Sequence, residues 1–385
     1  MYCVLLASYA LNAADRQLFP LLLHDVRDSF HFSLADAGLL STIFTLGLAV
    51  AGLPTGFALA RLSRKSVLLI GIAIFSTGTA LTAFSRGFPD LVFYLFATGI
   101  GEAMQFTVIV AIAASYFVSN RSAAIGSVNF CFGIGAFSGP VLASLLLTSY
   151  QTWRIPMIAF GLAGYCVIIA VILSVRPWLS EAHALSHARQ STGGASTLLN
   201  LNSLILIALS IIAGLVLYGF TGLYATFLRE SLHYPPKQAG YITGFYGAGA
   251  LVSVGGGWLG DRFSPRALLA TAFLGIALVG YFCFHHTGSL ATQIILTAAF
   301  GATASGVVFV NLVGYHVKAV RHELASRASG LFVTSFYLAA ATAGYVMGQL
   351  ASRWGWAHAE FIQVSLLSIV GAGIALALRP TQMCL

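Results

Sequence analysis

The feature that most constrains this chain is a succession of twelve apolar segments, each about as long as a helix that crosses a lipid bilayer. They are continuously apolar and do not alternate as the strands of a membrane barrel would. A helix satisfies its own backbone hydrogen bonds inside lipid. The sequence therefore predicts an all-α polytopic membrane protein with twelve transmembrane helices, at about residues 2–23, 37–60, 66–85, 90–117, 121–149, 153–175, 203–228, 239–259, 266–285, 290–318, 324–351 and 356–379.

The composition excludes an ordinary soluble domain. Hydrophobic residues make up 58% of the 385 residues and charged residues only 8%, whereas soluble domains carry about 25% charged residues. We expect contact with the lipid bilayer and with no nucleic acid, because the basic residues behind the net charge of +8 are scattered through short loops. The first segment lacks the positively charged N-terminal region and the small-residue cleavage site of a signal peptide, so we interpret it as a retained helix rather than a cleaved signal.

The loop charges predict an orientation. With the N-terminus in the cytoplasm, twelve basic residues fall on the cytoplasmic side and six on the opposite side, as the positive-inside rule requires. We therefore expect a multi-pass protein of the inner (plasma) membrane with both termini cytoplasmic. The five cysteines show no paired or metal-type spacing, and we expect a monomer with no cofactor and no metal site.

The longest connection, "RPWLSEAHALSHARQSTGGAST", lies between the sixth and seventh segments. Its mixed charge, Ser and Gly-Gly indicate a linker, with a short interfacial helix around Trp178 to Arg189. We predict an N-terminal six-helix bundle over 1–175, a cytoplasmic linker over 176–202 and a C-terminal six-helix bundle over 203–385.

The two halves repeat one another. "GFALARLSRK" follows the second segment and "GWLGDRFSPR" follows the eighth, with matching residues 201 positions apart. Parallel six-helix repeats around a midplane binding site are a plan of secondary transporters. The matched pairs are Gly56 with Gly257, Arg61 with Arg262, and Lys65 with Arg266.

With this repeat the chain resembles the major facilitator superfamily, and the resemblance extends over essentially its full length. That family carries a Gly-x-x-x-Asp-Arg-x-x-x-Arg signature, which the second half meets with Gly257, Asp261, Arg262 and Arg266. The first copy keeps Gly56, Arg61 and Lys65 but has Ala60 at the Asp position. The resemblance implies alternating access, with both runs acting as a conformational latch; plain positive-inside anchoring is the alternative.

A finer resemblance starts at residue 12. "NAADR" is similar to the Asn-x-x-Asp-Arg pattern of the anion:cation symporter branch, which spinster-type lipid transporters share. "LFATGIGEA", residues 95–103, resembles the Arg-x-x-x-Gly-x-x-Glu-Ala motif of those branches. Leu95 stands where the family has an arginine associated with binding the substrate anion, so one anion anchor is missing.

Three ionisable residues lie deep in the predicted helices: Asp15, Arg16 and Glu102. Because charges in the membrane usually face the bundle interior and pair, we expect Arg16 to reach Glu102, and Asp15 to face a cavity or a neighbouring helix. Burial makes a carboxylate hold its proton more tightly and a nearby guanidinium less tightly. The three residues are therefore predicted to couple protons to transport; a fixed ion pair that only sets helix packing is the alternative.

Polar and aromatic residues of the cavity-lining segments are the candidates for substrate contact. Interhelical hydrogen bonding or an interfacial belt is an alternative for each. They are Tyr9, Asn12, Arg16, Gln105, Asn129, Tyr218, Tyr224, Tyr246 and Asn311. In the fifth segment, Gly135, Gly139 and Pro140 resemble the Gly-x-x-x-Gly-Pro motif of antiporters, and Gly344 and Gly348 are its expected packing counterpart.

These features predict a secondary active transporter whose substrate is a small molecule and whose coupling ion is the proton. The leading hypothesis is symport of a small organic anion, a sugar acid or a carboxylate. The alternative is a spinster-like or drug-type carrier of amphipathic or lipid molecules, working by proton-coupled antiport. A membrane enzyme is disfavoured, because no nucleophile–base or metal constellation lies near a membrane face.

Overall fold

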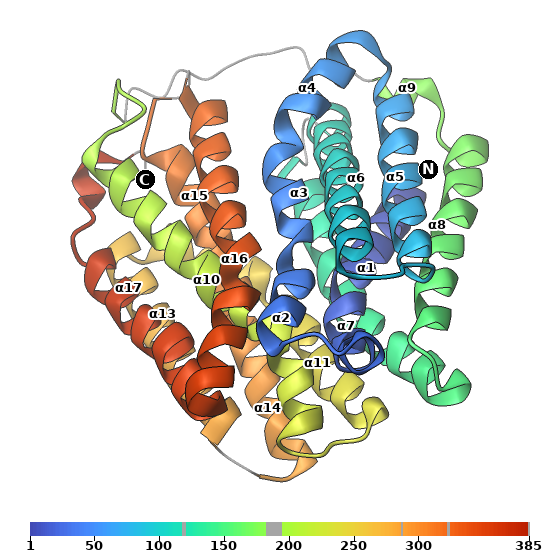
Figure 1. Cartoon of the computed structure of the whole chain (residues 1–385). Helices are drawn as coiled ribbons and strands as arrows, with labels where there is room; N and C mark the ends of the chain where they lie inside the picture. Colours follow the sequence, from blue (N-terminus) through green and yellow to red (C-terminus); the bar gives the residue numbers. More distant parts are fainter. Residues whose placement is uncertain (118–120, 182–194, 286–287, 322–323, 384–385) are drawn as a thin grey trace. The chain divides into compact units, whose positions relative to one another are not determined.

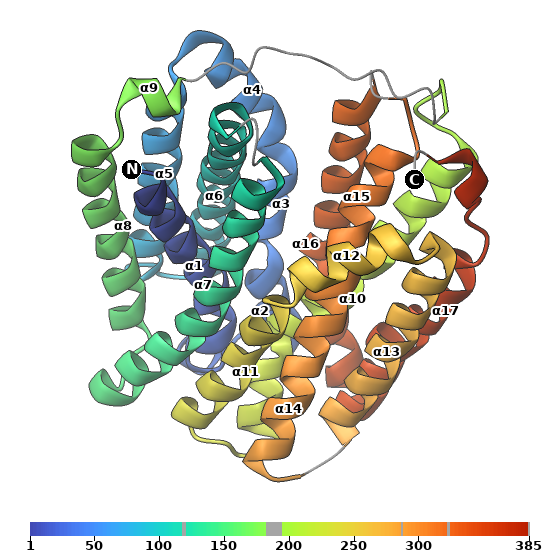
Figure 2. The same ribbon diagram turned by 180° about the vertical axis from the view of Figure 1, so that it is seen from behind.

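The structure, a computed structural model, describes residues 1–117, 121–181, 195–285, 288–321 and 324–383. These residues form helices almost throughout (Figures 1 and 2). The elements are α1 (Tyr2–Phe30), α2 (Leu34–Thr42), α3 (Phe44–Val50), α4 (Gly52–Arg61), α5 (Arg64–Thr82), α6 (Phe88–Tyr116), α7 (Arg121–Tyr150), α8 (Arg154–Ser174), α9 (Pro177–Ser180), α10 (Leu201–Glu230), α11 (Pro236–Ala250), α12 (Ser253–Arg262), α13 (Pro265–His285), α14 (Leu290–Gly301), η1 (Ala302–Phe309), α15 (Val310–Lys318), α16 (Ala325–Glu360), η3 (Phe361–Leu366), α17 (Leu367–Ala375) and η4 (Pro380–Gln382).

The predicted fold class is confirmed, and the twelve segments map onto these helices. Seven segments are single helices: α1, α5, α6, α7, α8, α10 and α13. The second segment is broken into α2, α3 and α4, the eighth into α11 and α12, and the tenth is α14, η1 and α15. The last two segments run from α16 through η3 to α17, and Gly355 separates them with a φ of 81°, a conformation that glycine adopts without strain.

The described chain forms two compact units. Unit 1 comprises Met1–Phe32, Ile43–Ser186 and Leu228–Gly247; unit 2 comprises Ser33–Thr42, His187–Phe227 and Ala248–Leu385. The domain boundaries expected from the sequence remain a prediction. Of the expected linker, α9 is described, but residues 182–194, which would hold most of the interfacial helix, lie outside the described residues.

Unit 1 is built on close helix contacts that small residues permit. α1 packs along α7, and α5 packs between α6 and α8 (Figure 1). A Cβ on Gly135 of α7 would lie 2.1 Å from the carbonyl oxygen of Ala10, and one on Gly139 would lie 2.5 Å from that of Ala14. These glycines therefore bring α7 against the backbone of α1 directly beside Asp15.

Unit 2 also contains close helix contacts at small residues. α13 lies beside α17, and α2 packs against α16 (Figures 1 and 2). A Cβ on Gly344 would lie 2.0 Å from the carbonyl oxygen of Gly38, and one on Gly348 would lie 2.4 Å from that of Leu34. Gly344 and Gly348 thus pack α16 against the start of the second predicted segment.

The contact between α5 and α6 leads to a prediction about stability. A Cβ on Gly101 of α6 would lie 2.5 Å from backbone atoms of Gly71 and Phe75 on α5. Gly101→Ala must therefore separate the helices, and we expect it to lower the free energy of unfolding by about 1–3 kcal/mol, visible as a lower Tm in detergent. Gly126→Ala is the matched control, because a Cβ there has nothing within 4 Å. Equal Tm values for both variants would contradict the packing argument.

Candidate functional site

The candidate site lies inside unit 1, where α1 faces α6. Arg16 of α1 reaches Glu102 of α6 with 3.0 Å between Nε and Oε2. The same Nε donates to the amide oxygen of Asn12 at 3.1 Å, one turn earlier on α1. Glu102 is completely buried and Arg16 is 8% exposed. This is a charged pair removed from solvent, and loss of one partner would leave the other charge buried alone.

Asp15 completes a group of three charged side chains. Its Oδ2 accepts from the Thr79 hydroxyl of α5 at 2.8 Å, and its side chain lines the same pocket as those of Arg16 and Glu102. Asp15 Oδ1 and Glu102 Oε1 are buried, and no donor in the described part of the chain reaches them. Asp15 therefore faces a neighbouring helix, α5, which is one of its two expected orientations.

A series of hydrogen bonds between buried side chains runs from this group toward the start of α1. The Asn12 amide donates to Gln105 Oε1 at 2.8 Å and to the carbonyl oxygen of Glu102 at 3.3 Å. Gln105 in turn donates to the Ser8 hydroxyl at 3.1 Å. Asn12, Gln105 and Ser8 are all completely buried. A fully connected buried network of this kind fixes the rotamers of its members, so it holds Arg16 in place.

A small pocket with room for a water molecule lies beside the charged residues. One part of its lining is polar and the other apolar. Leu95, at the position of the family arginine, is one of the apolar lining residues, so an arginine there would enter the same pocket. The polar lining is Asp15, Arg16, Thr79, Thr82, Thr98 and Glu102, and the apolar lining is Leu18, Phe19, Phe44, Leu95 and Met157.

The other expected substrate-contact residues are spread over both units. In unit 1, Tyr9 is buried and stacks on Phe106 with 5.3 Å between ring centroids, Asn129 is half-buried on α7, and Tyr246 is buried on α11. These positions are compatible with helix packing as well as with substrate contact.

Three expected contacts belong to unit 2. Tyr218 lies among the rings of Phe336 and Tyr337, and buried Tyr224 donates to the side chain of Gln293. Asn311 of α15 donates to the carbonyl oxygens of Gly256 and Val307, each at 2.9 Å. The amide of Asn311 thus joins α15 to α12.

The two signature runs make equivalent contacts in the two repeats. Lys65 donates to the carbonyl oxygens of Ile172 and Val175 near the end of α8, at 3.1 and 2.7 Å. Its counterpart Arg266 donates to the carbonyl oxygen of Leu378, just beyond α17. In each repeat a basic residue at the start of the third segment therefore caps the end of the sixth.

The remaining signature residues lie near the ends of α4 and α12. Asp261 accepts from Lys318 of α15 at 2.7 Å, and the guanidinium of Arg262 lies 4.5 Å from the ring centroid of Trp258. Arg61 is exposed, and neither Gly56 nor Gly257 has a neighbour closer than 3.8 Å to a Cβ built on it. The contacts shown by Lys65, Asp261, Arg262 and Arg266 each lie within one unit, and the latch stays a prediction.

Sequence reasoning missed several polar groups. Thr79 and Ser8 gave no signal, because threonine and serine are common in membrane helices and usually bond to their own backbone. Glu360 was not among the candidates: it is completely buried, is hydrogen-bonded to the Ser365 hydroxyl, and its Oε2 lies 3.5 Å from Nδ1 of His285. The signal that could have found it is an acidic residue inside the last predicted segment, 356–379.

A family comparison settles what kind of protein contains this site. The model of the Major Facilitator Superfamily matches residues 5–344. The chain belongs to this superfamily. Its family and fold indicate a membrane transporter, in agreement with the predicted resemblance.

Relatives and a solved structure refine the comparison. Protein spinster of Drosophila melanogaster is 27% identical over 47% of this chain, and the match covers 30% of spinster's own length. The cis,cis-muconate transport protein of Acinetobacter baylyi is 24% identical over 69% of this chain and 67% of that protein. The crystal structure of a bacterial homolog of the human lysosomal transporter spinster, in an inward-facing and unoccupied conformation, has the same fold, with a TM-score of 0.80. The two sequences are 16% identical, and the match covers 99% of this chain and 96% of the homolog.

Proposed function

We propose that this transporter carries a small organic anion, a carboxylate or sugar acid, together with a proton by alternating access. The observation that carries the proposal is that two buried carboxyl groups, those of Asp15 and Glu102, line one pocket together with the guanidinium of Arg16, which pairs with Glu102. If both acids ionise, the group has a net negative charge in a medium of low dielectric, which is costly. One bound proton makes the group neutral and lets the two acids hydrogen-bond to each other.

Movement of the helices then determines whether the acids bind or release the proton. When α1 and α6 change their distance, Arg16 moves relative to Glu102, and the acids gain or lose their proton. A guanidinium in this position also binds a carboxylate in the two-pronged manner that suits anionic substrates. The water-sized pocket beside the acids offers room for a proton-carrying water. We propose further a monomer in the plasma membrane with both termini cytoplasmic.

A second candidate function is carriage of an amphipathic molecule, as in spinster-type transporters. Leu95 favours it, because this residue gives the pocket an apolar wall where the family arginine would add a positive charge. The likeness to spinster points the same way, and the likeness to a muconate transport protein favours the anion.

The deciding experiment is solute-driven pH change in proteoliposomes. We expect an inward gradient of cis,cis-muconate or a sugar acid to acidify the lumen of vesicles that contain the protein, because symport brings a proton in with each solute. Protein-free vesicles are the control. Alkalinisation of the lumen by a lysolipid, with no response to either anion, would contradict anion symport and support the second candidate.

A further inference from the structure

A second buried acid lies in unit 2, at a place that no proton or substrate role above uses. Glu360 is the last residue of α16, and its side chain is completely buried. The chain continues directly into η3, a wider π-helical turn that holds the buried Ser365. Turns of this kind inside α-helices are frequent at functional sites. The carboxyl group of Glu360 is therefore a candidate for a role besides packing.

The contacts of Ser365 show which state of the acid this packing holds. Its Oγ is hydrogen-bonded to Oε1 of Glu360 and lies 3.0 Å from the carbonyl oxygen of Ala277 on α13. A carbonyl oxygen can only accept a hydrogen bond, and a serine hydroxyl has one hydrogen to donate. Ser365 therefore donates to Ala277, and the hydrogen between Ser365 and Glu360 comes from the carboxyl group. Glu360 is protonated in this arrangement.

The second carboxyl oxygen agrees with a bound proton. Glu360 Oε2 is buried, and no donor among the described residues hydrogen-bonds to it. A neutral acid group tolerates a buried oxygen without a partner far better than a carboxylate does. The site is also closely packed, because a Cβ on Gly280 of α13 would lie 3.4 Å from Oε1. A proton is a ligand that needs no cavity.

His285 connects the buried acid to the end of α13. Its Nδ1 lies 3.5 Å from Oε2 of Glu360 and 2.9 Å from the carbonyl oxygen of Tyr281. Because that carbonyl oxygen can only accept, Nδ1 carries a hydrogen. The side chain of His285 is 27% exposed, so the imidazole can exchange protons with water through Nε2.

Other titratable groups leave the charge of Glu360 to His285. Cys283 of α13 interacts electrostatically with Glu360, but a buried thiol stays neutral at neutral pH. Arg353 and His358 of α16 are exposed. No titratable residue occurs in η3, α14 or α17, and the unit 2 part of α10 has only tyrosines. His285 provides the one ion pair that Glu360 makes within the described ranges.

We propose that Glu360 and His285 form a proton-binding site in unit 2 that exchanges its proton with the membrane face where α13 ends. A proton from water binds Nε2 of His285, the Nδ1 hydrogen moves to Oε2 of Glu360, and the imidazole is left neutral with its hydrogen on Nε2. A half-turn of the carboxyl group, whose last torsion is broad and two-fold, then presents the new hydrogen to Ser365.

Uptake of the proton stabilises the packing of α13 against η3. Its loss leaves a buried carboxylate with one partly exposed partner, which is costly. The site is separate from Asp15, Arg16 and Glu102, which belong to unit 1. It needs no solute, and its proton returns to the face from which it came, so it adds nothing to the number of protons that are transported.

The test follows the proton of the acid group by infrared spectroscopy of the protein in detergent, without solute. At about pH 6 an exposed glutamate is ionised. We nevertheless expect the C=O stretching band of a protonated carboxyl group in the native chain and its loss in Glu360→Gln. Ser365→Ala retains the acid but removes its acceptor, so the same band should appear at a higher frequency. The assignment thus does not depend on whether Glu360→Gln folds.

The path through His285 is tested by transfer of the protein into D2O. We expect His285→Gln to slow hydrogen–deuterium exchange of the Glu360 band about 100-fold, the scale on which a positioned acid–base group speeds proton transfer. His358→Gln is the matched control. Its Nδ1 also lies 2.9 Å from a carbonyl oxygen of its own helix, but it forms no ion pair with Glu360 in the described structure.

Two results would overturn the proposal. One is a carboxyl spectrum that neither Glu360→Gln nor Ser365→Ala changes, and the other is an equal exchange rate in the two histidine variants. A chain that shows the band and its slowed exchange, yet moves neither proton nor solute in vesicles, supports this site and contradicts the proposed function alone.

Discussion

Replacing Glu102 by Gln is expected to abolish proton-driven accumulation while leaving substrate exchange intact. The amide keeps the size of the side chain and still offers an oxygen to Arg16, 3.0 Å away in the native pair. Its NH2 group can donate to Asp15 Oδ1, which is buried without a donor among the described residues. The variant therefore imitates the protonated state permanently and cannot release a proton.

The measurement compares two assays on the same vesicles. With an imposed pH gradient and the electrical potential clamped, we expect the ratio of internal to external solute to fall to about 1, because a carrier without a coupled proton only equilibrates its solute. Counterflow of labelled solute against unlabelled solute should persist. Asp36→Asn is the matched control, since Asp36 bonds to Ser33 at an exposed helix start. Accumulation at the wild-type level in Glu102→Gln would remove Glu102 from the coupling mechanism.

The sequence predicts the architecture well because its strongest signals are local. Continuous apolar length decides where each helix crosses the bilayer, and all twelve segments correspond to helices in the structure. The kink at Gly355 lies in the gap between the last two predicted segments, whereas the break between α11 and α12 leaves little trace in hydropathy, because the residues around it stay apolar. Near this break, a Cβ on Gly249 would lie 2.0 Å from the carbonyl oxygen of Ala298, a contact between helices that hydropathy does not encode.

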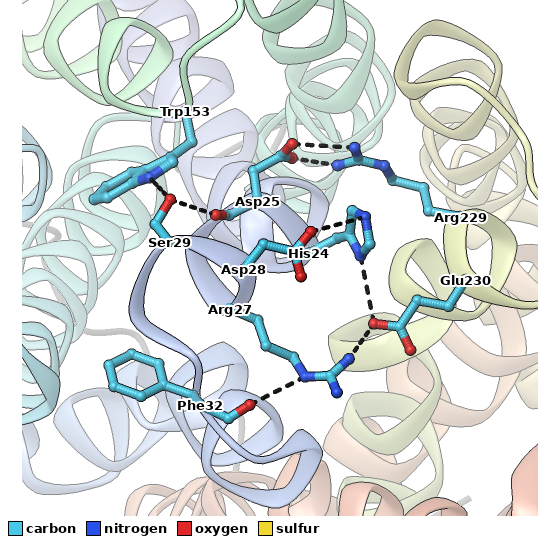
Figure 3. Close-up of polar contacts among 9 residues, drawn as sticks. All are labelled: His24, Asp25, Arg27, Asp28, Ser29, Phe32, Trp153, Arg229 and Glu230. Carbon is cyan, nitrogen blue, oxygen red and sulfur yellow. Dashed lines mark hydrogen bonds and ion pairs between the residues drawn. The ribbon is translucent and has the colours of Figure 1, made fainter.

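In the candidate site, too, the residues with a local signal could be predicted, and the contacts that depend on helix packing could not. Asp15, Arg16 and Glu102 stand out because charges are rare in apolar helices, and Arg16 does reach Glu102. Thr79 could not be singled out, since its pairing with Asp15 depends on how α5 is rotated about its axis. The pairing of Arg229 with Asp25 (Figure 3) was equally inaccessible to sequence reasoning: the two residues are 204 positions apart, and each alone resembles an ordinary loop charge. Pairings between distant helices require the packing itself.

Replacing Arg16 by Ala is expected to abolish binding of an anionic substrate and to weaken the fold. The change leaves two buried acids without their counter-charge, and removal of one partner of a buried pair costs about 3–5 kcal/mol. Arg86→Ala is the control, because Arg86 is exposed and its Asp90 contact uses the backbone nitrogen. Tm in detergent and substrate binding by calorimetry are recorded for each variant, so that loss of folding and loss of binding can be told apart.

The double variant Arg16→Met, Glu102→Met separates a structural role from a functional one. Apolar residues of similar size remove the pair together, and such replacements in buried ion pairs are often neutral or stabilising. We expect its Tm to recover toward that of the native chain, while anion binding and proton-driven uptake stay absent. If the recovered variant accumulates the anion as the native chain does, Arg16 and Glu102 serve only helix packing, and neither the proton nor the substrate is handled by this pair.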